Sequence, residues 1–131
     1  MIPGDLSKKR YTVFYTDRMS DYLGTMDENS SWGDSYSYRY WISFRRDDRI
    51  IGYFELGGNN LTPEVSEKHQ RIIDILKPND GRRDEYKYKR VYKTKSISFH
   101  DGDEEEEITK KVDSIIKELI GMENDLFKKL Q

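Results

Sequence analysis

Residues 37–56 of the chain read SYRYWISFRRDDRIIGYFEL, and this stretch decides the fold. Successive side chains of a β-strand point to opposite faces, so apolar residues at every second position predict a strand with one buried face. The first half of the stretch places on one such face Tyr38, Tyr40, Ile42 and Phe44. Asp47 and Asp48 follow as turn residues, and residues 49–56 alternate again. We therefore predict a β-hairpin with strands over residues 37–45 and 49–56.

An amphipathic helix is predicted directly after the hairpin. Thr62 followed by Pro63 marks its start, because a threonine hydroxyl can cap free amides and proline lacks only a donor that has no partner there. Apolar residues then recur at helical spacing up to Leu76. Pro78 prevents further continuation, so the helix has about four turns.

A long C-terminal helix is predicted over residues 103–130. Acidic residues crowd its first turn and lysines close its last turn, which suits the helix dipole at both ends. Its apolar stripe consists of Ile108, Val112, Ile115, Ile116, Leu119, Ile120, Leu126 and Phe127. A break near Gly121 is an alternative to one continuous helix.

Further strands are predicted on both sides of the hairpin. Residues 10–16 alternate as a strand, and the polar residues 24–37 predict a long loop. Residues 86–99 are rich in Tyr, Val, Thr and Ile, but their alternation slips near Arg90 and Val91, which indicates either two short strands or one strand with a bulge. The predicted class is α+β, an antiparallel sheet of about four to five strands with a middle helix and a long C-terminal helix packed on it.

The composition limits the kinds of protein this chain can be. A length of 131 residues suits a single domain over residues 1–131, and 13% aromatic residues favour a folded core despite 37% charged residues. The absence of cysteine excludes a disulfide framework and thiolate chemistry, which suits the cytoplasm. No apolar run is long enough for a signal peptide or a membrane span. A net charge of -2 means that nucleic-acid binding requires a local basic patch.

No residue pattern in the chain specifies a catalytic reaction. The nearest is an E-x-K triplet at residues 85–87, but metal-dependent nucleases place the partnering acid on a different strand, whereas Asp80 closely precedes this triplet. His69 shares the apolar stripe of the middle helix and is expected to be partly buried with one hydrogen-bond partner. His100 is expected to end a strand. We expect no catalytic residue, no metal site and no cofactor.

Two tryptophans lie where the predicted core does not include them, Trp32 in the polar loop and Trp41 on the polar face of its strand. Aromatic residues of this kind are enriched at protein interfaces. The predicted protein-contact surface consists of Trp32, Tyr38, Tyr40, Trp41 and Tyr53. The alternative is that a helix covers this face of the sheet.

A basic strip with interleaved tyrosines precedes the C-terminal helix. Cations that follow phosphates beside aromatic rings that stack on bases are typical of single-strand binding. The candidate nucleic-acid-binding residues are Tyr86, Lys87, Tyr88, Lys89, Arg90, Lys93 and Lys95. Protection of an edge strand, or neutralisation by the acidic start of the C-terminal helix, is the structural alternative.

The runs Tyr40-Trp41-Ile42-Ser43-Phe44 and Ile51-Gly52-Tyr53-Phe54-Glu55-Leu56 precede a helix, a charged Tyr-rich strand and a long final helix. In this order the chain resembles the accessory α+β domain downstream of the catalytic core in some bacterial and phage defence-associated nucleases. The resemblance covers residues 38–130 and includes no catalytic motif. It implies a recognition part without a nuclease part, as in stand-alone phage or mobile-element proteins, a class that includes inhibitors of host defence.

We therefore predict a non-enzymatic binding module with a protein partner. The resemblance implies a phage-encoded inhibitor of a bacterial defence complex of the CRISPR or restriction type. A nucleic-acid-binding accessory domain is the alternative, and a protein that binds or sequesters a small nucleotide is a further one. We expect a cytoplasmic protein without membrane contact, either a monomer or a homodimer through the C-terminal helix.

Overall fold

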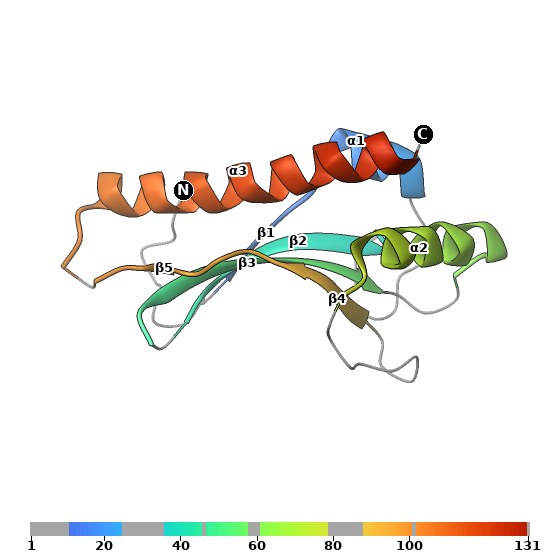
Figure 1. Ribbon diagram of the computed structural model, residues 1–131. Coiled ribbons are helices and arrows are strands. Elements are labelled where there is room, and N and C mark those ends of the chain that lie inside the picture. Colours follow the sequence, from blue (N-terminus) through green and yellow to red (C-terminus); the bar gives the residue numbers. More distant parts are fainter. Residues whose placement is uncertain are drawn as a thin grey trace.

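A computed structural model describes residues 11–24, 36–45, 47–57, 61–78, 88–100 and 102–130 of the chain. Within these residues it has a five-stranded antiparallel sheet and three helices, so the predicted α+β class is confirmed (Figure 1). The elements in chain order are β1 (Tyr11–Phe14), α1 (Asp17–Leu23), β2 (Tyr38–Phe44), β3 (Arg49–Gly57), α2 (Pro63–Leu76), β4 (Tyr88–Lys93), β5 (Ile97–Ser98) and α3 (Glu105–Leu130).

The predicted hairpin forms the centre of the sheet. Strands lie in the order β1-β2-β3-β4, and the short β5 pairs with the first residues of β3. The β2 and β3 strands pair from Tyr38 opposite Leu56 to Phe44 opposite Ile50. Asp48 has a φ of 61° in the connecting turn, a conformation that a short polar side chain tolerates. The predicted strands and turn are therefore confirmed.

The slip in alternation near Arg90 and Val91 corresponds to a β-bulge. In the pairing of β3 with β4, Phe54 faces Tyr92 but the next residue, Glu55, faces Arg90, so Val91 is the extra residue. The segment also divides into β4 and the separate β5. Both predicted alternatives thus occur in one segment.

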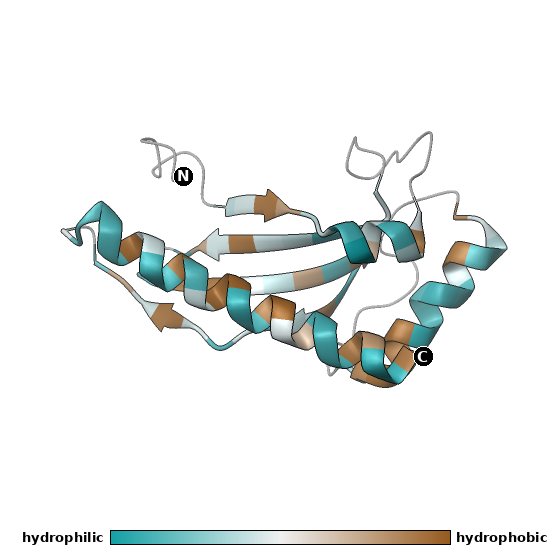
Figure 2. Ribbon diagram, turned by 90° about the horizontal axis from the view of Figure 1, so that it is seen from above, coloured by the Kyte–Doolittle hydropathy of each residue, from teal (hydrophilic) through white to brown (hydrophobic). Residues whose placement is uncertain are grey.

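Helix α3 covers one face of the sheet, here called the inner face, together with α1 (Figure 1). Seen from above, α3 crosses the strands obliquely (Figure 2). It crosses β3 at Gly52, where an added Cβ would lie only 2.5 Å from Cγ2 of Ile115. Glycine is required there because the helix approaches the strand backbone closely. The helix continues through Gly121, so the alternative of a break at that residue is wrong.

The core lies between α3 and the inner face. It is unusually aromatic: Tyr38, Tyr40 and Phe54 are fully buried side chains, and Tyr40 stacks on Phe54 with ring centroids 4.8 Å apart. Ile115, Leu119 and Leu126 from the predicted stripe of α3 pack against them, as does Met122. Large rings allow a chain with only 34% hydrophobic residues to bury a continuous core.

Helix α2 begins and ends as the sequence predicts. The Thr62 hydroxyl accepts a hydrogen bond from the amide of Val65 at 3.2 Å, and Pro63 occupies the first turn. The helix ends at Leu76, and Lys77 follows with a left-handed φ of 47°. Ile72 and His69 face the core, and the helix packs against α3 and β4 at one end of the sheet.

Helix α1 is absent from the sequence prediction. Thr16 caps it by accepting from the amide of Met19, and Met19 and Leu23 are buried one turn apart. This cap followed by two apolar residues four positions apart is the signal that could have indicated it. The predicted loop at residues 24–37 lies outside the described residues between 25 and 35, as does Trp32. Among the described helices none is both long and apolar enough to cross a membrane.

Candidate functional site on the outer sheet face

Tyr38 and Tyr40 do not belong to a contact surface, because both side chains lie on the inner face with no solvent exposure. Their hydroxyls join a buried polar network. Tyr40 donates to Oε1 of Glu123 at 2.7 Å, and Tyr38 donates to the backbone carbonyl of Thr16 at 3.0 Å. Their placement in the predicted contact surface is therefore corrected: the strand alternation turns them toward α3, on the face opposite Trp41.

Glu123 is the centre of this network. Its side chain is only 3% exposed, and its oxygens accept hydrogen bonds from Tyr40, from the Thr16 hydroxyl at 2.6 Å and from the guanidinium of Arg18 at 3.1 and 3.2 Å. Burial and the neighbouring Glu123 carboxylate raise the pKa of Tyr40 far above its ordinary value, so the phenol stays a donor. The hydrogen bonds of this network connect α1 to β2 and α3, so the network stabilises the fold.

The opposite, outer face of the sheet brings aromatic residues of three strands into one row. Tyr11 of β1 meets Trp41 of β2 edge to face at 5.9 Å, and Trp41 lies beside Tyr53 of β3 at 4.8 Å. We call Tyr11, Trp41 and Tyr53 the aromatic row. Tyr11 is 53% exposed, Trp41 is half-buried and Tyr53 is buried. No described helix lies over this face (Figure 1).

Arg90 of β4 extends the aromatic row. Its guanidinium lies 3.9 Å from the ring centroid of Tyr53 and 5.8 Å from that of Trp41, which are cation–π distances. The same group donates to Oε2 of Glu55 at 3.1 Å, and Glu55 is 4% exposed. Arg90 therefore covers Tyr53, neutralises a buried carboxylate and leaves Tyr11 and Trp41 as the accessible rings of the row.

The bulge decides which members of the predicted basic strip share this face. Lys93 pairs with Tyr53 and Arg90 with Glu55, so both lie on the outer face, whereas Lys89 pairs with the inner-facing Leu56. Lys95 is exposed beyond the end of β4. Tyr86 and Lys87 lie outside the described residues, and of Tyr88 only the backbone position in the strand is described. The predicted strip is thus divided, and its outer part joins the aromatic row.

Cations dominate the strand positions of the outer face, although the whole chain has a net charge of -2. Register and alternation place on this face Arg39, Arg45, Arg49, Arg90 and Lys93, against the single described carboxylate of Glu55. Arg45 pairs with the turn residue Asp47 at 3.5 Å, and Glu55 is already paired with Arg90. The described part of the outer face is therefore basic, and it carries the exposed Tyr11 and the half-buried Trp41.

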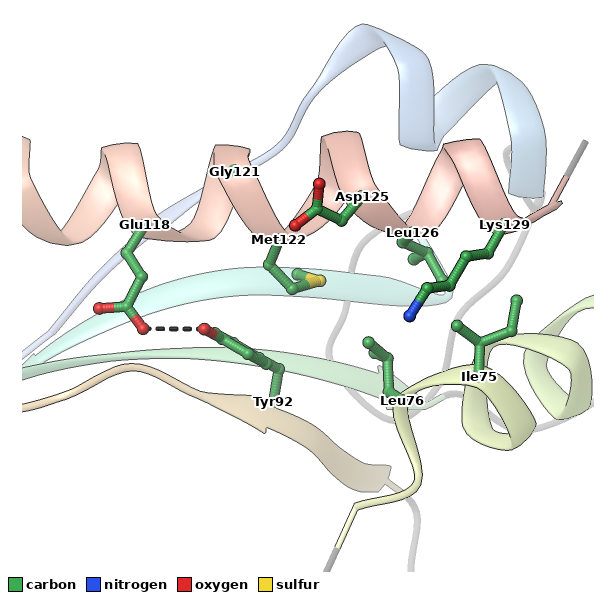
Figure 3. A pocket seen from close by; sticks show the side chains of 9 residues that line it. All are labelled: Ile75, Leu76, Tyr92, Glu118, Gly121, Met122, Asp125, Leu126 and Lys129. Carbon is green, nitrogen blue, oxygen red and sulfur yellow. Dashed lines mark hydrogen bonds between the residues drawn. The ribbon is translucent and has the colours of Figure 1, made fainter.

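A pocket lies on the inner side of the sheet, between α2, β4 and α3. This pocket has a volume of about 440 Å³, and side chains from all three elements line it (Figure 3). Tyr92 of β4 donates to Oε2 of Glu118 of α3 at 2.8 Å. Burial, with the adjacent Glu118, raises the pKa of Tyr92 to about 12. The sequence analysis did not group these residues into a binding site, because three separate segments form the pocket.

The histidines take the places that the sequence predicts. His69 is 7% exposed, and its Nε2 lies 3.0 Å from the Ser37 hydroxyl. Burial lowers its pKa to about 4, so it is neutral at physiological pH. His100 follows β5, and its amide donates to Asp103. Across the described ranges, no group of three or more His, Cys, Asp or Glu side chains could hold a metal ion.

Comparison of the chain with protein-family models, with curated proteins and with solved structures found no significant match. The resemblance to the accessory domain of defence-associated nucleases stays a prediction.

Proposed function

We propose that this chain is a non-enzymatic module that binds single-stranded nucleic acid on the outer face of its sheet. The observation that carries the proposal is the contact of Arg90 with Tyr53 and Trp41, beside Lys93 on the same face. Proteins that bind single strands combine a positive surface along the backbone with aromatic side chains on which bases stack. The outer face offers both within four adjacent strands.

The exposure of each residue indicates which part of the nucleic acid it is expected to contact. Tyr11 and Trp41 keep accessible ring surface, so they are the residues expected to meet bases. Lys93 and Arg45 are exposed and are expected to contact phosphates. Arg90 is engaged with Glu55 and Tyr53, and we expect it to hold the row in place and add positive potential.

A single strand fits this surface better than a duplex. The described part of the outer face is built from strands alone, and stacking on Tyr11 or Trp41 requires unpaired bases. A duplex would present only its phosphates to the same cations. We therefore expect single strands to bind more tightly than duplexes of equal length.

The test measures fluorescence anisotropy of labelled single- and double-stranded DNA and RNA at about 50 and about 200 mM salt. The double variant Arg45→Gln, Lys93→Gln removes two exposed cations of the outer face. Its matched control, Lys110→Gln, Lys117→Gln, removes two exposed cations of α3 and keeps the same net charge. Loss of two phosphate contacts should reduce the slope of log affinity against log salt by about 1.4 on single strands.

The same measurement on Trp41→Ala and Tyr11→Ala tests the stacking. Each should lose about 1 to 3 kcal/mol of binding free energy with little change in the salt slope. Absence of binding at about 50 mM salt, or equal losses in the outer-face and α3 double variants, would reject the proposal.

A protein partner is the second candidate, and the exposure of Tyr11 favours it. Tyr11 is the exposed large hydrophobic side chain of the described residues, and it lies on β1, which ends the strand order beside Trp41. An aromatic pair at a sheet edge suits a contact in which a partner adds a strand, and an inhibitor of a defence complex would use such a contact. A photo-crosslinker at residue 11 tests this: crosslinks to one protein that disappear in Trp41→Ala support it, and crosslinks that persist reject it.

A further inference from the structure

The geometry points to a second binding site, independent of the outer face: the pocket between α2, β4 and α3 takes an organic ammonium ion with an aliphatic body. Its volume of about 440 Å³ lies within the range of small-molecule sites. Figure 3 shows the lining side chains converging from the three elements.

The floor of the pocket is apolar. Met122 and Leu126 from α3 face Ile75 and Leu76 from the end of α2 (Figure 3). Met122 is 7% exposed and unbranched, so its thioether can adapt to an irregular aliphatic body. This floor provides the contact area, and the polar groups around it decide which head group enters.

One end of the pocket consists of acceptors. The Tyr92 hydroxyl donates a hydrogen bond to Glu118, which leaves the lone pairs of the phenol oxygen to accept a hydrogen bond from a ligand. The phenol stays neutral at physiological pH, because burial and the adjacent carboxylate raise its pKa to about 12. Asp125 lies one helical turn beyond Met122 on the same wall and is exposed. A cation with N–H donors matches this end, and an anion is repelled.

Among the described residues, no cation forms an ion pair with the Glu118 carboxylate at this end of the pocket. Within the described part of the chain, Glu118 receives its hydrogen bond from the neutral phenol of Tyr92, and its Oε1 is buried without a hydrogen-bond partner. Glu118 lines the pocket next to Tyr92 and orients the phenol through this hydrogen bond, so we treat it as a positioning residue. An uncompensated carboxylate in a partly buried place favours the arrival of a cation.

Lys129 limits the length and charge of the ligand. Its side chain extends from the last turn of α3 into the pocket, and its ammonium lies above Leu76 (Figure 3). A second ammonium at that end would meet Lys129, so a monoamine fits better than a diamine of similar length. The carboxylates of the pocket also disfavour the phosphates of a nucleotide, so the pocket does not suit a nucleotide-binding role.

The experiment titrates the full chain, labelled with ¹³C at its methionine methyl groups, with hexylammonium, hexanol and hexanoate, and follows the Met122 signal by NMR. These probes share one aliphatic body and differ in head-group charge. We expect hexylammonium to shift the Met122 signal with saturation, at an affinity about tenfold above that of hexanol, the ratio that one charge-assisted hydrogen bond provides. Hexanoate should not saturate. Equal responses to all three probes would mean that the pocket has only an apolar floor, and would overturn the assignment.

Variants assign the head-group contacts. Asp125→Asn and Tyr92→Phe should each weaken hexylammonium binding about tenfold, while Lys129→Gln should strengthen it. Asp113→Asn is the matched control, because Asp113 is also an exposed carboxylate of α3 and lies outside the pocket. Unchanged affinity in Asp125→Asn, or an equal loss in Asp113→Asn, would reject the site. Because Asp125 is exposed, its substitution leaves the fold intact.

One further probe, compared with hexylammonium, distinguishes a free amine from a protein side chain. A peptide with one lysine between glycines presents the same ammonium and aliphatic stem on a backbone. Tighter binding of the peptide than of hexylammonium would identify a lysine of a partner as the ligand. Binding of hexylammonium alone would identify a free amine.

Discussion

Gly52 of β3 lies directly beneath Ile115 of α3, so that a Cβ at residue 52 would approach Cγ2 of Ile115 to 2.5 Å and Cδ1 of Leu119 to 3.0 Å. This contact sets the distance between the long helix and the centre of the sheet. The backbone of Gly52 is also held from the side, because its amide donates to the Thr94 hydroxyl at 2.9 Å.

We expect Gly52→Ala to lower the free energy of unfolding by about 1 to 3 kcal/mol, because the added methyl group overpacks the contact between helix and strand. Gly121→Ala is the matched control, since a Cβ there meets no atom within 4 Å. That change should stabilise the helix by about 0.5 to 1 kcal/mol. Denaturant unfolding of both variants measures the two changes in the free energy of unfolding. A change of the same sign in both variants would contradict the close approach of α3 to Gly52.

Glu123 and Tyr40 are expected to be energetically coupled, because their 2.7 Å hydrogen bond is buried and charge-assisted. Tyr40→Phe should cost about 1.5 to 3 kcal/mol, since it removes a donor from a buried carboxylate. In a double-mutant cycle with Glu123→Gln the two losses should fall short of additivity by about 1 kcal/mol. Tyr11→Phe, a change at an exposed hydroxyl, should leave the free energy of unfolding unchanged. Additive losses in the cycle would show that the two residues act separately.

A comparison of two threonine N-caps separates the free energy of capping from that of the buried network. Thr62 caps α2 alone, whereas Thr16 caps α1 and also donates to Glu123 at 2.6 Å. Thr62→Ala should cost about 1 kcal/mol, as is typical of an N-cap. Thr16→Ala should cost clearly more, because the Glu123 carboxylate loses a donor. Equal midpoints of denaturation for the two variants would contradict a contribution of Thr16 beyond its N-cap.

His69 should make the protein less stable in mild acid. Its pKa is about 4 in the fold and near 6.5 when unfolded, so between these values the unfolded chain binds a proton that the fold excludes. The free energy of unfolding therefore falls as the pH falls from about 6.5 to about 4. His69 contributes about 3 kcal/mol to that loss, at about 1.4 kcal/mol for each unit of pKa difference.

His69→Gln separates this contribution from that of the carboxylates. Glutamine keeps a hydrogen-bonding group near Ser37 but does not titrate. Urea unfolding from pH 7 to pH 4 should show a shallower pH dependence in this variant. Identical slopes for the variant and the parent chain would remove His69 as the cause.

The elements with strong periodicity could be predicted from the sequence alone. The hairpin at residues 37–56, the start of α2 at Thr62 and the stripe of α3 follow from side-chain spacing, and they occur as expected. Helix α1 was missed because it has only seven residues, too few for its apolar spacing to stand out from the neighbouring polar segment.

The candidate site was less predictable than the fold. Alternation separated Trp41 from Tyr40, but it could not say which of the two faces a helix would cover. Tyr40 became core because α3 lies on its side, and Trp41 stayed on the outer face. The pocket around Tyr92 could not be foreseen, because its walls come from three separate segments of the chain, at residues 75–76, 92 and 118–129.

The sequence by itself determined the strongly periodic elements, the cap of α2 and the amphipathic faces, because these depend on neighbours within a few residues. Only the tertiary structure decided that Arg90 and Lys93 join Trp41 and Tyr53 on one face. The reason is physical: a bulge changes the face of every later side chain, and its position depends on pairing with β3 across 35 residues of chain. Likewise, Glu123 is a buried anchor only because Thr16, Arg18 and Tyr40 are brought to it from the other end of the chain.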